Sequence, residues 1–204
     1  NTYISSYNAN MVSNEVFLDS ATLRENIVSL ARNIGYVPRS RRSARTNVTF
    51  TVNVSNYTTK PQSITLNKGL ALSSLVFGSE AYIFSILDDV TVPVVNNLAI
   101  FESVDAYEGT YITENFIVDS YDPNQRFILP NSNIDTSTIR VIVKPNEFSN
   151  ISRKYVQSES LFNVTSESPV FWVQEIEDER YELIFGDGVF GKKLEAPNYI
   201  EVSY

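Results

Sequence analysis

Three glycines and a lysine close together have the spacing of a phosphate-binding loop. In IFGDGVFGKKL, residues 184–194, Gly186, Gly188 and Gly191 satisfy G-x-G-x-x-G, and the stretch from Gly186 to Lys192 satisfies G-x-x-x-x-G-K. Such loops bind phosphate because glycines let backbone N–H groups approach the anion, and because the N-terminus of the next helix points at it. The chemistry would be nucleotide binding, and it requires a helix directly after the loop.

The residues after Gly191 do not have the character of a helix. They read KKLEAPNYIEVSY, in which Pro197 interrupts the chain and the last six residues alternate like a strand. Lys193 also stands where a nucleotide loop needs a Ser or Thr to hold magnesium. We therefore expect no nucleotide and no other cofactor here.

A turn between two strands explains the same glycines. RYELIF alternates apolar and polar residues, and residues 199–204 alternate again, so a β-hairpin is predicted. Asp187-Gly188 is a favoured pair for its type I′ turn, in which both residues have positive φ. Gly186 and Gly191 then permit a bulge or a close approach of two backbones. These four residues are predicted to be a structural turn.

The chain has few residues for catalysis. It contains no histidine and no cysteine, which excludes Ser-His-Asp and Cys-His mechanisms and the common zinc sites. A glycosidase-like carboxylate pair is conceivable, with Glu175 and Glu177 on one strand face and Asp187 across the hairpin. The alternative is a solvated acidic rim, EIEDER. We expect no enzyme, no metal site and no small-molecule substrate.

The composition limits the classes of partner that we expect for this chain. The 204 residues are 43% hydrophobic and 20% charged, which describes an ordinary globular protein. The net charge of −8 disfavours nucleic-acid binding, since phosphate contacts need a basic surface. No apolar run is long enough to span a bilayer, so no membrane contact is expected. Because the sequence starts without Met and stops inside a strand pattern, we expect an excerpt of a longer polypeptide.

One strong helix signal lies near the start, in SATLRENIVSLARNIGY. Its apolar residues recur at helical spacing and form one stripe, which we treat as a candidate subunit interface: Leu23, Ile27, Leu30 and Ile34, with Ala31 between them. Ser20 or Thr22 is the expected cap, Thr22 forming a capping box with Glu25, and Gly35 the expected stop. The apolar stripe must be buried against other residues, which could come from residues 1–18, from another chain or from a missing segment.

An arginine-rich segment comes after the predicted helix. PRSRRSAR contains Arg39, Arg41, Arg42 and Arg45 within seven residues. It is either a solvated linker or a strip that docks an acidic neighbour, because opposite charges attract over long range. We include Arg39, Arg41 and Arg42 in the candidate interface.

From Asn47 onward the apolar period changes to two, which is typical of strands. The expected fold class is mainly β with an N-terminal helical segment, α+β overall, with an antiparallel sandwich or barrel-like domain. We expect a helical assembly segment with its linker at 1–45 and a β-rich region at 46–204. Strands are predicted at residues 47–54, 64–66, 81–87, 111–118, 139–143, 170–173, 181–185 and 199–204.

The last part of the chain has a family resemblance. YELIFGDGVFGKKLEAPNYIEVSY resembles the FGDG-x-x-G-x-x-L…N-x-I-x-V-x-Y segment of the baseplate J-like family, and more narrowly the baseplate wedge proteins of contractile-tailed bacteriophages. SPVFWVQEIEDERYEL and YEGTYITENFIVDSYDPNQRFILPNSNIDTSTIRVIV are similar to the preceding strands of those proteins. PQSITLNKGLAL resembles the opening of their β-region. The resemblance covers roughly residues 15–204.

This resemblance implies a structural protein of the virion without catalytic residues. Family members belong to baseplate wedges, join neighbouring wedges into a ring around the tail hub, and rearrange when the tail contracts. The implied partners are other copies of the chain and other wedge and hub proteins, assembled in the host cytoplasm. The alternative is a β-rich receptor- or glycan-binding module of a phage tail or adhesin, in which exposed Tyr and Trp would stack on sugars.

Overall fold

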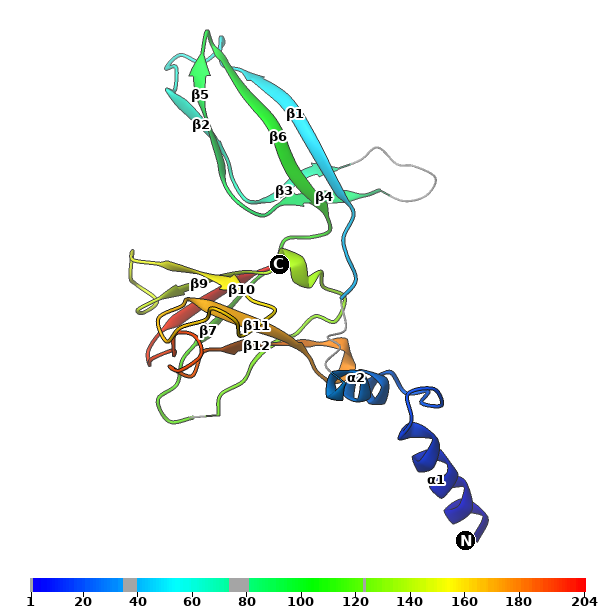
Figure 1. The fold of residues 1–204 in the computed structure, drawn as a ribbon. Coiled ribbons are helices and arrows are strands. Elements are labelled where there is room, and N and C mark those ends of the chain that lie inside the picture. Colours follow the sequence, from blue (N-terminus) through cyan, green and yellow to red (C-terminus); the bar gives the residue numbers. More distant parts are fainter. Residues whose placement is uncertain (1, 35–39, 74–80, 123) are drawn as a thin grey trace.

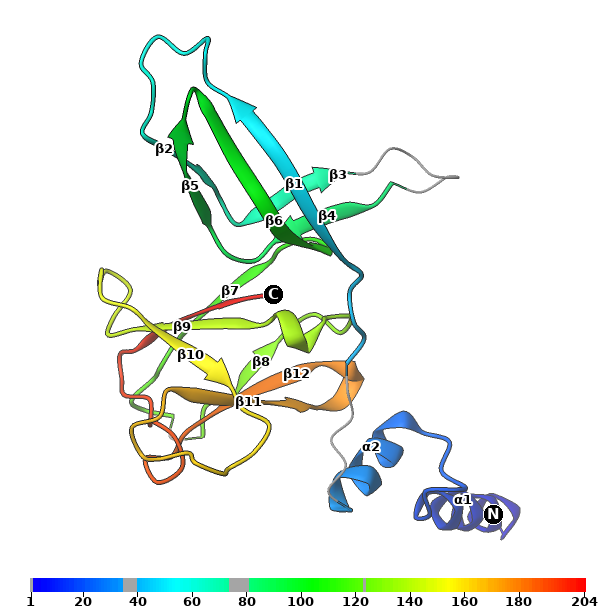
Figure 2. The ribbon, with the colours of Figure 1, turned by 45° about the horizontal axis from the view of Figure 1, so that its top comes forward.

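Two β-sheets form the body of the molecule, and a helical arm leaves it at one end (Figures 1 and 2). The structure is a computed structural model that describes residues 2–34, 40–73, 81–122 and 124–204. Each sheet has a core cluster of its own. The chain runs from the arm into the first sheet, and from there into the second.

The arm consists of helix α1 (Thr2–Glu15) and helix α2 (Arg24–Asn33). In both views α1 points away from the sheets, whereas α2 lies beside the second sheet (Figures 1 and 2). The expected helix over residues 20–35 is therefore present but begins at Arg24. The expected stop at Gly35 lies outside the described residues.

The first sheet has six strands: β1 (Arg45–Asn53), β2 (Ser63–Leu66), β3 (Gly69–Ser73), β4 (Ile83–Ile86), β5 (Val90–Val95) and β6 (Leu98–Glu108). Strand β6 is its centre. It pairs with β1 along one edge and with β5 and then β4 along the other, and β2 and β3 complete the order β2-β5-β6-β4-β3. All these pairings are antiparallel.

The sheet encloses an apolar face built by alternation. Five residues of its core are fully buried: Ile86, Ala99, Phe101, Val104 and Ala106. Phe101 stacks on Phe50 of β1 with ring centroids 4.8 Å apart. Alternation holds on each side of the register shift in β6, which keeps Val104 and Ala106 in the same core as Ala99 and Phe101. Thr and Asn residues of β1 point outward.

The second sheet has seven strands: β7 (Thr113–Ile117), β8 (Phe127–Leu129), β9 (Arg140–Lys144), β10 (Arg153–Gln157), β11 (Val170–Glu175), β12 (Tyr181–Phe185) and β13 (Tyr199–Ser203). Their order is β7-β13-β9-β10-β11-β12-β8, with only β10 and β11 parallel. Short 3-10 helices η1 (Thr136–Thr138) and η2 (Glu177–Glu179) lie between strands.

Aromatic side chains fill the second sheet and bring its two end strands together. Phe185 contacts Phe127 and Tyr155 edge-on, with centroid distances of 5.4 and 5.8 Å. Phe116 of β7 meets Phe127 of β8 at 5.7 Å, although these strands are at opposite ends of the strand order. The sheet is therefore nearly closed, like a barrel.

The predicted fold class, mainly β with an N-terminal helical segment, is confirmed, and each predicted strand has a counterpart. Strands β3, β5, β6, β8 and β10 were not predicted from the sequence. The longest of them, β6, is broken by a register shift where Ser103 has a φ of +55°, so its apolar residues do not alternate continuously. The region expected at 46–204 consists of two sheets.

Candidate subunit interface

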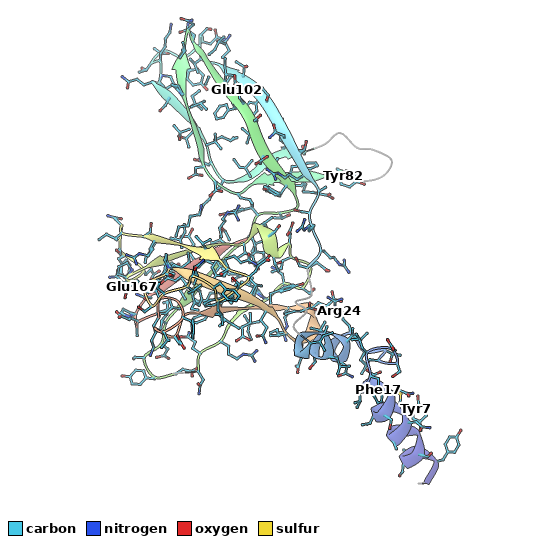
Figure 3. All side chains as sticks on the ribbon, viewed as in Figure 1. Tyr7, Phe17, Arg24, Tyr82, Glu102 and Glu167 are labelled. Atoms are coloured by element: carbon cyan, nitrogen blue, oxygen red, sulfur yellow. The ribbon has the colours of Figure 1, made fainter. Side chains whose placement is uncertain are left out.

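Helix α1 exposes apolar side chains along its length. Tyr3, Ile4, Tyr7 and Val12 are each more than 60% exposed, and Met11 is 42% exposed. Figure 3 shows Tyr7 and Phe17 on this arm, well away from the two sheets. A helix of 14 residues is only marginally stable in water by itself, so contacts with residues outside the helix must stabilise it.

The side chain of Glu15 joins the two helices. Its carboxylate accepts hydrogen bonds from the backbone N–H of Thr22 at 3.0 Å, from the Thr22 hydroxyl at 2.7 Å and from the Asn26 amide at 2.8 Å. The Asn26 bond, and after it the Thr22 bonds, lower the pKa of Glu15 to about 2. The capping box expected between Thr22 and Glu25 stays a prediction, because the Glu25 side chain lies outside the described residues; the Thr22 hydroxyl donates to Glu15, and the Ser20 hydroxyl donates to the carbonyl of Asn14 in α1.

The apolar stripe of α2 is divided between the protein and solvent. Val28 and Ala31 are buried at 9% and 8% exposure, and Ile27 and Leu30 are half-buried. The two outer members of the candidate interface remain exposed, Leu23 at 53% and Ile34 at 75%. Helix α1 does not cover them, because it extends away from α2 (Figure 1).

An ion pair fixes α2 to the second sheet. Nε and Nη2 of Arg24 donate to Oε1 of Glu175 at 3.1 and 2.9 Å, and the Glu175 side chain is only 5% exposed. Figure 3 places Arg24 where the arm meets the body. A cavity of about 700 Å³ lies between α2 and the β11–β12 turn. Helical periodicity put Arg24 on the solvent face instead, because no local pattern connects residues 151 positions apart.

The arginine segment is tethered through its serines. The Ser43 backbone and hydroxyl both donate to Asp135 at 2.9 Å, and the Ser40 and Thr136 hydroxyls are 2.8 Å apart. Burial alone would raise the pKa of Asp135, but the hydrogen bonds from Ser137 and Ser43 hold it below its ordinary value. Arg41 and Arg42 are exposed, and Arg39 lies outside the described residues.

The glycine loop is a compact turn held by close backbone contacts. A Cβ atom on Gly186 would lie 2.1 Å from the carbonyl carbon of Gly191, so only glycine fits. Gly188 and Gly191 have φ values of +93° and +83°. Oδ1 of Asp187 accepts from the N–H of Val189 and Phe190 at 2.8 Å. The backbones of Gly186 and Gly191 therefore approach each other closely, as predicted.

The predicted hairpin around this loop is wrong. β12 pairs with β11 and β8, while β13 pairs with β7 and β9, so the two strands that flank the loop are not neighbours. Asp187 does not have positive φ, so the turn is not type I′. Two other pairs of successive residues have positive φ at both positions: Asn96-Asn97 between β5 and β6, and Asp178-Glu179 between β11 and β12.

The two chemical alternatives were nucleotide binding at the glycine loop and a glycosidase-like carboxylate pair. Strand β13, not a helix, comes after the glycine loop, so the loop lacks the following helix that nucleotide binding needs. Glu175 lies opposite Tyr181 at one end of β12, whereas Asp187 comes after the other end, so the strand separates the two carboxylates. Glu177 lies in η2, not in a strand.

Ion pairs connect the two sheets. Glu201 of β13 accepts from Lys68 of the first sheet at 3.1 Å and from Lys144 at 3.3 Å. Asp88, before β5, contacts Lys154 at 3.3 Å and Arg140 at 3.6 Å. Burial alone would raise the pKa of Glu201, but the two lysines hold it below its ordinary value. Charged side chains therefore form part of the junction between the sheets.

Metal-binding clusters and membrane-spanning helices are both absent from the described part of the chain. Within 2–34, 40–73, 81–122 and 124–204, no group of three acidic side chains is placed to hold a metal ion. No helix in these same ranges has the length and apolar character needed to cross a bilayer.

Comparison with known proteins gives two matches. The family described as "Bacteriophage baseplate wedge protein gp6, third domain" matches residues 113–204, which are β7 to β13 and thus the second sheet. The chain is also 26% identical over 180 residues to the "Baseplate wedge protein gp6" of Enterobacteria phage T4. The aligned part is 85% of this chain and 25% of that protein, so the chain spans about a quarter of its relative's length. The baseplate J-like assignment is not confirmed, and both matches are to baseplate wedge proteins.

Proposed function

We propose that this chain is a structural part of a contractile-tail baseplate wedge and that its helical arm joins neighbouring wedges into the ring around the tail hub. The match of the second sheet to a wedge-protein domain supports the baseplate role. The single observation that carries the joining role is the arm itself, which presents two helices with uncovered apolar side chains beyond the body. The partners are other copies of the chain and other wedge and hub proteins.

The exposed ends of the α2 stripe define where the partner binds. Burying Leu23 and Ile34 against a neighbour contributes on the order of 1.5–3 kcal/mol each. The exposed Arg41 and Arg42 lie just beyond α2 and steer an acidic neighbour, so association weakens as salt rises. Val28 and Ala31 keep α2 on the body while its outer face binds.

Charged contacts at the junction support a second part of the proposal, the rearrangement that triggers sheath contraction. Interfaces within a chain permit relative motion unless they are large and hydrophobic. Here the contacts that bridge the two sheets include the pairs Lys68–Glu201 and Asp88–Lys154. A change of angle between the sheets exchanges such pairs for water without opening either core.

The decisive experiment changes the outer face of α2 and measures assembly. We expect sedimentation velocity to show concentration-dependent association of the unchanged chain, and Leu23→Asp with Ile34→Asp should abolish it. Ser29→Asp, on an exposed position of the same helix, is the matched control and should associate normally. Circular dichroism should show both variants folded. Normal association of the double variant, or a chain that is monomeric at all concentrations, contradicts the joining role.

A further inference from the structure

Strand β1 leaves one whole edge of the first sheet open. It pairs with β6 alone among the described strands, and the opposite edge of β6 is already occupied by β5 and β4. With nine residues, β1 is the longest strand at an end of either sheet. An edge of this length presents a row of unpaired N–H and C=O groups that another strand can pair with.

Two backbone hydrogen bonds at the ends of β1 identify those groups. The N–H of Val54 donates to Asn97 at 2.9 Å, and the N–H of Glu108 donates to Ala44 at 2.8 Å. Because the bonding direction alternates along a strand, the even-numbered residues of β1 face β6. The odd-numbered residues turn their backbone groups to the free edge: Arg45, Asn47, Thr49, Thr51 and Asn53.

The other terminal strands have protection that β1 lacks. β2 has only four residues, and β3 contains a register shift between Leu70 and Leu72. β7 and β8 are brought together by the aromatic contact that nearly closes the second sheet. β1 has no proline or lysine, and its single charge, Arg45, is neutralised by Asp105 at 2.5 Å. Nothing in β1 discourages an incoming strand.

An apolar cavity opens between this edge and the opposite end of the sheet. Its volume is about 160 Å³. β1 contributes Val48 and Phe50 to its wall, and β2 and β3 contribute Leu66, Ala71 and Leu72. Among the described residues, eleven apolar side chains around the first core are only partly buried, against five that are buried. In this part of the chain the cavity beside β1 therefore remains unfilled.

We propose that the free edge of β1 receives an extended segment of a partner polypeptide, which adds a strand to the first sheet and places apolar side chains over the cavity. The backbone groups of the odd-numbered residues provide affinity, and the cavity selects a segment with an apolar residue at every second position. Because the cavity wall is apolar, the side chains of the segment that face it are apolar. This surface is separate from the helical arm and does not depend on the baseplate role.

A second copy of β1 does not meet these requirements. The Val48 and Phe50 side chains of such a copy are committed to its own core, where Phe50 stacks on Phe101. It would bring backbone groups but no apolar side chain for the cavity. A separate extended segment provides both.

Amide hydrogen exchange with a probe peptide tests the proposal. The probe is a nine-residue peptide of alternating valine and threonine, and the control peptide has the same composition with its valines in one block. In the chain alone, the amides of Thr49 and Thr51 should exchange fast and those of Phe50 and Val52 slowly. The alternating peptide at ten times its Kd should slow the two fast amides about tenfold. Equal slowing by the control peptide overturns the proposal.

Two variants separate the edge from the cavity. Ala71→Leu fills the cavity and should weaken peptide binding at least about tenfold, whereas Thr59→Leu in an exposed loop should leave it unchanged. Thr51→Pro removes one outward N–H and should also abolish binding, since proline is tolerated on edge strands. Unchanged binding in both variants overturns the proposal. Slow exchange of the Thr49 and Thr51 amides in the chain alone also overturns the proposal, because it shows that the edge is already paired. If this slow exchange depends on protein concentration, a second copy of the chain pairs with the edge.

Discussion

The two sheets have similar strand numbers but close their cores differently. Among the described residues, the second sheet buries thirteen core side chains and leaves six partly buried, whereas the first buries five and leaves eleven partly buried. The difference arises at the ends of the sheets. β7 and β8 meet through Phe116 and Phe127, but among the described strands β1 pairs only with β6.

This difference suggests a division of labour. A nearly closed sheet holds its shape by itself, and it is the part that matches the wedge-protein domain. An open sheet has apolar surface and backbone groups available for partners, at some loss of its own stability. Both the proposed arm and the proposed strand site lie outside the closed sheet. Substitutions in each sheet, at the junction between them and in the arm test this comparison.

The largest effect should come from removing a phenyl ring from the closed core. Phe171 and Phe101 are both 1% exposed, one in each sheet. Phe171→Ala should lower the free energy of unfolding by about 5 kcal/mol, because its surroundings cannot collapse into the void. Phe101→Ala should cost about 3 kcal/mol, because the open sheet can relax around Phe50. Urea denaturation measures both, and equal costs contradict the comparison.

The second effect concerns the glycine loop of the closed sheet. Gly186→Ala places a Cβ 2.1 Å from backbone atoms of Gly191, which cannot move without the loop, so it should cost at least about 3 kcal/mol. Gly188→Ala only places alanine at a φ of +93°, with its nearest neighbour at an ordinary 3.6 Å, and should cost about 1–2 kcal/mol. Thermal unfolding ranks the two. The reverse ranking would show that positive φ, not close approach, explains the glycines.

The glycine loop also shows which structural features could be predicted from the sequence and which could not. Glycine spacing indicated a tight loop, but the pairing of β12 and β13 with other strands is a long-range property that no local pattern contains. Two pairs without glycine, Asn96-Asn97 and Asp178-Glu179, have positive φ instead, and a search for glycine does not find them.

The candidate interface was predictable in part for the same reason. Helical periodicity located α2 correctly, because the stripe depends on neighbours along the chain. It did not reveal that Val28 and Ala31 face the body, or that Arg24 reaches Glu175, since both depend on where the second sheet lies. Glu15 was missed because a carboxylate that caps another helix has no fixed spacing.

The third effect concerns the junction between the sheets. Glu201→Gln removes the charge that Lys68 and Lys144 share, and should lower stability by about 1 kcal/mol, since these side chains are partly exposed. It should also widen the range of angles between the sheets in small-angle X-ray scattering. Glu195→Gln, on an exposed residue nearby, is the control.

The pH dependence has a definite sign. Because the pKa of Glu201 is held below its ordinary value, its contribution is present above that ordinary value and is lost as the pH falls through the folded pKa. The Gln variant should lack this loss. If wild type and variant respond alike to acid, the lysine contacts do not join the sheets.

The smallest effect on overall stability should come from Glu15, which belongs to neither sheet. Its side chain is partly exposed yet holds the start of α2 through Thr22 and Asn26, and its pKa is lowered from 4.5 to about 2. The junction therefore holds above pH 4.5 and is released as the pH falls toward 2. NMR titration of the Glu15 carboxyl should give a midpoint near 2, and a midpoint near 4.5 would contradict the junction.

Replacing this residue tests whether the arm and the sheets are independent. Glu15→Gln keeps the side-chain length but weakens the bonds to Thr22 and Asn26, because an amide oxygen is a poorer acceptor than a carboxylate. The Thr22 and Leu23 amides should exchange faster, while the unfolding transition of both sheets stays unchanged. Asp19→Asn, between the helices, is the matched control and should change neither. A lowered unfolding transition in Glu15→Gln would mean that the arm contributes to the stability of the body. The exposed faces of α1 and α2 would then have a role in stability as well as in binding a neighbour.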